Sequence, residues 1–147
     1  MATLSEIVSE IKKAKNIAVV LHCSPDGDAI GSALALKEGL KSHEVTIVSS
    51  EDVPAIFETI CGKVVAANKL SENFDLIILP DVSELHRTGF AGIISKSSLR
   101  NKVMIIDHHK TGDLAKNIKL VFRDNEAVST TEMIDRVFSE LDRKSVV

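Results

Sequence analysis

The stretch from Ile17 to Asp28 reads IAVVLHCSPDGD, and it decides the fold. Its first half, Ile17 to His22, is a near-continuous apolar run, which is typical of a strand in a parallel sheet covered on both faces. Its second half is a polar turn, after which a helical pattern runs from Asp28 to Lys41. A buried strand followed at once by a helix is the repeating unit of α/β proteins. The ligand site of such proteins lies beyond the carboxyl ends of the strands, which is where this polar turn would lie.

The rest of the chain repeats this alternation of apolar runs and helical patterns. Capping-box patterns open helices near Thr3 and Ser129, and Asp52 is expected to cap a short helix that ends at Cys61. Four further apolar runs predict strands at Val45–Ser49, Phe74–Leu79, Lys102–Ile106 and Ile118–Phe122. We therefore predict an α/β fold with a doubly wound, mainly parallel five-stranded sheet and helices on both faces.

Length and composition exclude several classes of protein. The 147 residues suit one domain, 1–147, and a composition of 44% hydrophobic and 27% charged residues excludes a disordered or collagen-like chain. The net charge of −3 provides no bulk field for nucleic acid, so a phosphate-bearing substrate needs a local site. The two cysteines are too few for a disulfide framework. The longest apolar runs are about five residues, too short for a signal peptide or a membrane span. These features predict a soluble, cytoplasmic protein without a membrane partner.

Acidic and imidazole side chains follow four of the five predicted strands. They are His22, Asp26 and Asp28 after the first strand, Asp81 after the third, Asp107, His108 and His109 after the fourth, and Asp124 after the fifth. Because the carboxyl ends of parallel strands meet at one edge of a sheet, these groups are expected to lie close together. Several carboxylates in one place repel one another unless cations neutralise them.

A pair of divalent ions would balance the charge at this edge. The carboxylates of Asp26, Asp28, Asp81 and Asp124 carry about four negative charges in all, which two divalent ions would neutralise. A site rich in carboxylates with a few imidazoles suits Mn²⁺ or Mg²⁺ better than metals that prefer sulfur. Two such ions about 3.5–4 Å apart activate water against phosphate esters. Each residue alone has an ordinary explanation as a cap, turn or surface residue, and the joint occurrence at separate strand ends favours the metal centre.

Four short segments carry a family resemblance. They occur in order along the chain: HCSPDGDAIGS at 22–32, DVS at 81–83 with Arg87 and Gly89 downstream, DHH at 107–109 and DNEAVSTTE at 124–132. As a set they resemble the DHH phosphoesterase family, which is named for its Asp-His-His. The last segment and Arg87 are most similar to the branch of bacterial oligoribonucleases that also remove a phosphate from 3′-phosphoadenosine 5′-phosphate. Family II inorganic pyrophosphatases share the first and third segments, and cyclic-dinucleotide phosphodiesterases of the same family are not separated from the oligoribonucleases.

The resemblance implies a two-metal phosphoesterase acting on short oligonucleotides or nucleotides. Its cofactor would be two Mn²⁺ ions, with Mg²⁺ as the alternative, and a water between them would attack phosphorus. His22 and Asp26 would hold the first ion, Asp81 would bridge, and Asp28, His108 and Asp124 would hold the second.

The resemblance also implies roles around the metal centre. His109 would face the substrate phosphate, and Asp107 would orient a ligand imidazole. Ser32, expected at the opening of the helix after the first segment, and Arg87 would bind substrate, although an ordinary surface salt bridge also accounts for Arg87.

Length separates the chain from this branch of the family. Its members run past twice 147 residues and carry a second domain with a Gly-Gly-Gly-His motif, whereas this sequence has no adjacent glycines. We therefore expect a catalytic domain without its C-terminal substrate-binding domain. Weak activity is the expected result, and an apolar patch left by the absent domain would promote a homodimer. A non-catalytic metal- or nucleotide-binding module stays open as an alternative, although a plain nucleotide-binding domain would need a glycine-rich first turn.

Overall fold

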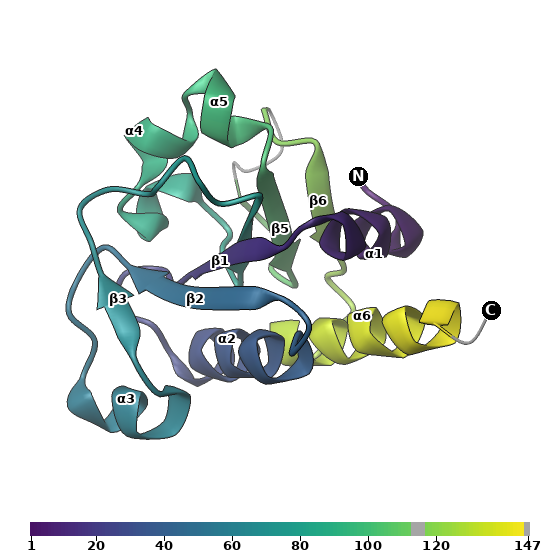
Figure 1. Cartoon of the computed structure of the whole chain (residues 1–147), viewed down its shortest axis with the longest axis horizontal. Helices are drawn as coiled ribbons and strands as arrows, with labels where there is room; N and C mark the ends of the chain where they lie inside the picture. The colour runs from purple at the N-terminus through teal and green to yellow at the C-terminus, as the bar shows by residue number, and fades with distance from the viewer. Residues whose placement is uncertain (113–116, 146–147) are drawn as a thin grey trace.

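The computed structural model describes residues 1–112 and 117–145, and Figure 1 shows how the elements of this part of the chain are arranged. No helix within these ranges is long and apolar enough to cross a membrane. In chain order the elements are α1 (Leu4–Lys13), β1 (Asn16–Val20), α2 (Gly27–Gly39), β2 (Glu44–Ser49), α3 (Ala55–Cys61), β3 (Val64–Ala66), β4 (Leu76–Pro80), the 3₁₀ helix η1 (Leu85–Thr88), α4 (Ala91–Ile94), α5 (Ser97–Arg100), β5 (Val103–Asp107), β6 (Leu120–Arg123) and α6 (Thr130–Ser145).

The sheet has six strands, and every paired neighbour is parallel. The strand order is β3-β2-β1-β4-β5-β6. The prediction of an α/β fold with a parallel sheet is confirmed, but the number of five strands was wrong. The strand that sequence reasoning missed is β3, an edge strand of three residues that pairs only with β2. Three residues are too few for an apolar run to stand out from a loop.

Several bounds also differ from the predicted ones: β1 ends at Val20 rather than at His22, and β4 begins at Leu76 rather than at Phe74. The short helix α3 begins at Ala55 with Pro54 as its N-cap, so Asp52 does not cap it. The last strand begins at Leu120, and Ile118 is buried just ahead of it. The capping box at Thr3 is confirmed: the Thr3 hydroxyl accepts from the Glu6 backbone, and the Glu6 carboxylate accepts from the Thr3 backbone.

Helices cover both faces of the sheet, which explains why its strands read as continuous apolar runs. On one face α1, α2 and α6 pack against alternate strand residues, such as Ile17 and Val19 of β1. On the other face α4 and α5 pack against the intervening residues, such as Ala18 and Val20. Because β1 is covered on both faces, its four residues after Asn16 are fully buried and apolar.

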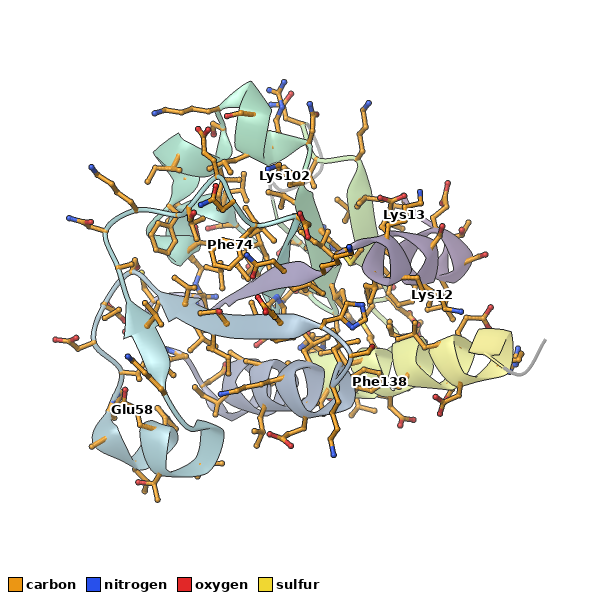
Figure 2. The ribbon with its side chains drawn as sticks, viewed as in Figure 1. Lys12, Lys13, Glu58, Phe74, Lys102 and Phe138 are labelled. Atoms are coloured by element: carbon orange, nitrogen blue, oxygen red, sulfur yellow. The ribbon has the colours of Figure 1, made fainter. Side chains whose placement is uncertain are left out.

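The helices α2 and α6 lie against each other, with little space between them at Gly39. A Cβ at this position would lie 2.2 Å from the ring of Phe138, which Figure 2 labels on α6. This contact fixes α6 beside α2, and the first turns of the two helices lie at the same edge of the sheet, where Thr131 donates to Asp28.

The strand order places a switch point between β1 and β4. The chain passes from β1 to β2 and β3 on one side, then crosses to β4 on the other side of β1. Ligands of open α/β sheets bind beyond the carboxyl ends of the strands at such a point. The polar turn after β1 and Asp81 after β4 both lie here. Asp81 has a φ of 59° and Ser24 a φ of 50°, a left-handed conformation that is uncommon for residues other than glycine.

Candidate metal centre

A first group of potential metal ligands joins the loop after β1 to the end of β4. His22, Asp26 and Asp81 each offer one ligand atom, and these three atoms lie within 4.8 Å of one another. His22 Nε2 lies 3.8 Å from Asp81 Oδ2, and both side chains are buried. Asp26 is exposed and caps α2, because its Oδ1 accepts from the Ala29 N–H at 3.0 Å. These are the residues predicted for one side of a bridged two-metal site.

The His22 ring is oriented by the backbone beside it. Its Nδ1 lies 2.8 Å from the carbonyl oxygen of Cys23, which can only accept, so Nδ1 carries a proton and donates it. In the neutral ring, Nε2 therefore keeps a free lone pair that faces Asp81. The carboxylate of Asp81 raises the pKa of His22 above its ordinary value and outweighs the opposing effect of burial. In the neutral ring, Nε2 would therefore be a nitrogen ligand that already faces the site.

A second group shares Asp81 with the first. Asp81, His108 and His109 offer ligand atoms within 4.8 Å of one another. Asp81 Oδ1 lies 3.6 Å from His108 Nε2 and 3.7 Å from His109 Nδ1, whereas its Oδ2 faces His22. One oxygen of this buried carboxylate thus faces the imidazole of His22, and the other faces the imidazoles of His108 and His109.

His109 also forms a shorter contact with Asp107. Its Nδ1 lies 2.6 Å from Asp107 Oδ1, and Asp107 Oδ2 accepts from Arg123 Nε at 3.0 Å. Asp107 is completely buried, so Arg123 supplies the charge that makes its burial tolerable. Asp107 therefore orients an imidazole, that of His109. Arg123 was not singled out from the sequence, where its only signal is its place at the end of the last strand.

Asp28, predicted as a ligand of the second ion, caps α6. Its Oδ2 accepts from the Thr130 N–H at 2.8 Å, and its Oδ1 accepts from the N–H and the hydroxyl of Thr131 at 3.1 and 2.8 Å. Burial, which raises the pKa of Asp28, is outweighed by these donors, so its pKa lies below the ordinary value. Asp28 Oδ2 also lies 3.5 Å from His108 Nε2, at the border of the second group.

Asp124, the other predicted ligand of the second ion, lies apart from both groups of described residues. Its Oδ2 accepts from Arg136 Nη1 at 2.6 Å, and its Oδ1 accepts from the Glu126 N–H at 3.0 Å. Arg136, first, and the Glu126 N–H both lower the pKa of Asp124. The carboxylate is thus neutralised by a cation of the protein, within the part of the chain that the structure describes.

The two predicted substrate-binding residues have different surroundings. Arg87 Nη2 lies 3.5 Å from His22 Nδ1, and the Arg87 carbonyl accepts from the Cys23 N–H at 2.6 Å, so Arg87 borders the first group. Ser32 was expected at the opening of a helix, but α2 begins at Gly27 and Ser32 is fully buried within it. Its hydroxyl lies 3.2 Å from that of Thr131. Ser32 is therefore a packing residue between α2 and α6, and we no longer assign it a substrate contact.

The donor atoms fit a divalent cation such as Mn²⁺ or Mg²⁺. Both groups combine imidazole nitrogen with carboxylate oxygen and contain no sulfur. Asp81 is 1% exposed, and a carboxylate buried this deeply is costly without a counter-charge. A cation between Asp81 and His22, or between Asp81 and His108, would supply this counter-charge.

Comparisons with known proteins find a relative in sequence and a structure with a similar fold. The chain is 29% identical to an uncharacterized protein of Methanocaldococcus jannaschii, over 90% of this chain and 41% of that protein. It also superposes on the crystal structure of an exopolyphosphatase-related protein from Bacteroides fragilis, with a TM-score of 0.76 and 24% identity. That match covers 94% of this chain and 43% of the neighbour, so the chain spans less than half the length of both proteins.

A family model covers nearly the whole described chain. The model of the DHH family, N-terminal domain, matches residues 16–146. The matched range begins at β1 and takes in every strand of the sheet and both groups of ligands built around Asp81. With its Asp-His-His at 107–109 beside these ligands, the chain belongs to the DHH family and corresponds to the N-terminal domain of that family.

Proposed function

We propose that this chain is the metal-binding domain of a phosphoesterase that hydrolyses phosphate esters of short oligonucleotides or nucleotides, with Mn²⁺ as its metal and the cytoplasm as its compartment. The observation that carries the proposal is the shared carboxylate of Asp81, whose Oδ2 faces His22 and whose Oδ1 faces His108 and His109. Two divalent ions about 3.5–4 Å apart activate water against phosphate esters, and a carboxylate shared by both sites would hold two ions close together.

Some of the site residues would hold the cations. His22, Asp26 and Asp81 would hold one ion, and Asp81 with His108 would hold another. Asp28 would contribute to the second ion through its Oδ2, which lies 3.5 Å from His108 Nε2, while it keeps its hydrogen bonds to the start of α6. Bound divalent ions supply a lowered pKa for water and positive charge for the phosphate oxygens. Asp124 was predicted as a further ligand; its ion pair with Arg136 would have to open before it could serve.

Arg87 and His109 lie beside the two proposed cation sites. Arg87 lies beside His22, where its guanidinium would bind a phosphate oxygen. The Asp107–His109 pair holds a proton on Nδ1 and keeps the imidazole, 38% exposed, in one orientation. A protonated or hydrogen-bonding imidazole there would stabilise the charge that develops on the phosphate.

A second domain is proposed to complete the catalytic unit. By analogy with the family, a C-terminal domain would hold the nucleotide, and the isolated domain would turn over slowly and associate as a homodimer. The exopolyphosphatase-related neighbour raises phosphoanhydrides as substrates. The alternatives are a family II pyrophosphatase-like activity, a cyclic-dinucleotide phosphodiesterase activity and a non-catalytic module, and the assay below separates them.

A hydrolysis assay tests the proposal and separates these alternatives. The chain, stripped of metal and reloaded with Mn²⁺, is incubated at high enzyme concentration with a linear dinucleotide, 3′-phosphoadenosine 5′-phosphate, a cyclic dinucleotide, pyrophosphate and polyphosphate. We expect release of nucleotide or phosphate from the first two substrates, lost in Asp81→Asn and kept in Asp75→Asn. These two variants make the same substitution at opposite ends of β4. Hydrolysis of only a phosphoanhydride or a cyclic dinucleotide would contradict the proposed substrate class, and Mn²⁺ binding without hydrolysis would favour a non-catalytic module.

A further inference from the structure

We infer that Thr130 and Thr131, the first two residues of α6, are positioning residues that aim the carboxylates of Asp81 and Asp28 for cation binding. The inference rests on the proposed function, since it assigns residues that support the proposed metal centre. Neither threonine is one of the His and Asp residues that form the two groups described above.

Thr130 contacts both acids at once. Its side chain is fully buried, and its hydroxyl donates to Asp81 Oδ1 at 3.1 Å. Its backbone N–H donates to Asp28 Oδ2 at 2.8 Å. Asp81 follows β4 and Asp28 lies in the first turn of α2, so one residue of α6 holds two acids from separate elements.

The hydroxyl of Thr130 decides which way the Asp81 carboxylate is turned. The terminal torsion of an aspartate is soft, so the backbone alone does not fix its two oxygens. With Oδ1 held by Thr130 on the side of His108, Oδ2 is left facing His22. Without this hydrogen bond the carboxylate would be free to rotate, and the sharing of Asp81 between the two groups would be lost for part of the time.

Thr131 holds Asp28 in a similar way. Its N–H and its hydroxyl both donate to Asp28 Oδ1, at 3.1 and 2.8 Å. With the Thr130 N–H, three donors at the start of α6 hold the Asp28 carboxylate, and its Oδ2 remains 3.5 Å from His108 Nε2. Partners that orient metal-binding side chains in this way typically change metal affinity about 10- to 100-fold when they are removed.

The test is calorimetric titration of the metal-stripped chain with Mn²⁺. Thr130→Val removes the hydroxyl but keeps the backbone donor and the branched shape. We expect its dissociation constants for Mn²⁺ to rise about 10- to 100-fold. Thr130→Ser restores the hydroxyl and should bind as the parent does. Thr59→Val is the matched control, because the Thr59 hydroxyl donates to the Ala55 carbonyl within α3 and touches neither acid.

A second variant keeps the test decisive if Thr130→Val fails to fold. Thr131→Val removes one of the three donors on Asp28 and leaves the Thr130 contacts intact. We expect it to weaken one Mn²⁺ site and spare the other. Thermal unfolding of each metal-free variant shows whether it is folded before titration. A purely structural role would lower the thermal stability of the variant without changing its Mn²⁺ affinity.

The outcomes separate this inference from the proposed function. If the parent binds Mn²⁺ and folded Thr130→Val and Thr131→Val bind it equally well, the positioning role is wrong and the metal centre stands. If the parent itself binds no Mn²⁺, the proposed function is overturned together with the inference.

Discussion

The carboxylate of Asp107 lies 2.6 Å from Nδ1 of His109 and is completely buried. Its other oxygen binds Arg123, whose side chain is 15% exposed. The Asp-His pair inside the Asp-His-His segment is thus part of a chain of hydrogen bonds that runs from Arg123 on β6 through Asp107 to His109. The arrangement explains why an acid at the end of β5 can be buried, and it makes Asp107 important for stability as well as for orienting His109.

Removing the charge of Asp107 should destabilise the protein strongly. Asp107→Asn leaves Arg123 largely buried without its counter-charge, and breaking such a pair typically costs about 3 kcal/mol or more. Urea unfolding of the metal-free chain measures the change. The control is Glu10→Gln, which breaks the exposed pair of Glu10 and Lys13 and should change the free energy of unfolding by less than about 1 kcal/mol. Equal effects in both variants would contradict the account.

Gly89 should not tolerate a side chain. Its φ of +74° is left-handed, and a Cβ would lie 2.0 Å from the hydroxyl oxygen and 2.4 Å from the Cβ of Ser50. Gly89→Ala should therefore lower the free energy of unfolding by about 2 kcal/mol and displace the neighbouring Arg87.

Gly92→Ala is the matched control in the same segment. Gly92 lies in α4, and a Cβ there meets nothing within 4 Å. Alanine should leave the free energy of unfolding unchanged or raise it by up to about 1 kcal/mol, because it favours the helix. If Gly89→Ala proves as harmless as Gly92→Ala in urea unfolding, the close approach to Ser50 is not present in solution.

The Asp75 carboxylate should stabilise the fold near neutral pH and lose this effect in acid. Its Oδ2 accepts from the N–H groups of Asn16 and Lys15, both at 2.9 Å, and these donors, Asn16 first, lower its pKa. A depressed folded-state pKa means that the stabilisation is complete above the unfolded value of about 3.9 and is lost as the pH falls through the folded-state pKa. The difference in free energy of unfolding between the parent and Asp75→Asn should therefore be constant near neutral pH and shrink below about pH 4. A difference that grows on acidification would have the wrong sign.

The His22 ring should be found in one tautomer. Because Nδ1 donates to the Cys23 carbonyl, the neutral ring of the metal-free protein should carry its proton on Nδ1 and none on Nε2. Long-range ¹⁵N–¹H correlation spectra, recorded above the raised pKa of this ring, distinguish the two tautomers. A diamagnetic divalent ion such as Mg²⁺ should then shift the Nε2 resonance. A proton on Nε2 would leave the ring unable to bind a cation in this orientation.

The sequence predicted the features of the site that are local in the chain. The apolar run of β1 and the acids after β4 and β5 are visible because a buried parallel strand and the turn after it have distinct compositions. The edge strand β3 was missed, because its three residues are paired on one side only and show no periodicity.

The contacts that distribute the acids could not be predicted in the same way. Asp28 and Thr131 are separated by 103 positions, and only the packing of α2 against α6 brings them together. For the same reason the sequence treated Asp28 and Asp124 as equivalent ligands, whereas the first caps α6 beside His108 and the second pairs with Arg136. Spacing indicates which residues lie at the same edge, but not which partner each side chain takes there.

The most direct test of the account is calorimetric titration of the metal-free chain with Mn²⁺, alongside Asp81→Asn and its matched control Asp75→Asn. If Asp81 is shared between two cation sites, the parent and Asp75→Asn bind two ions, and Asp81→Asn impairs both sites together. Binding that is indifferent to Asp81, or no binding by the folded parent, would contradict the claim that this carboxylate is the centre of a metal site.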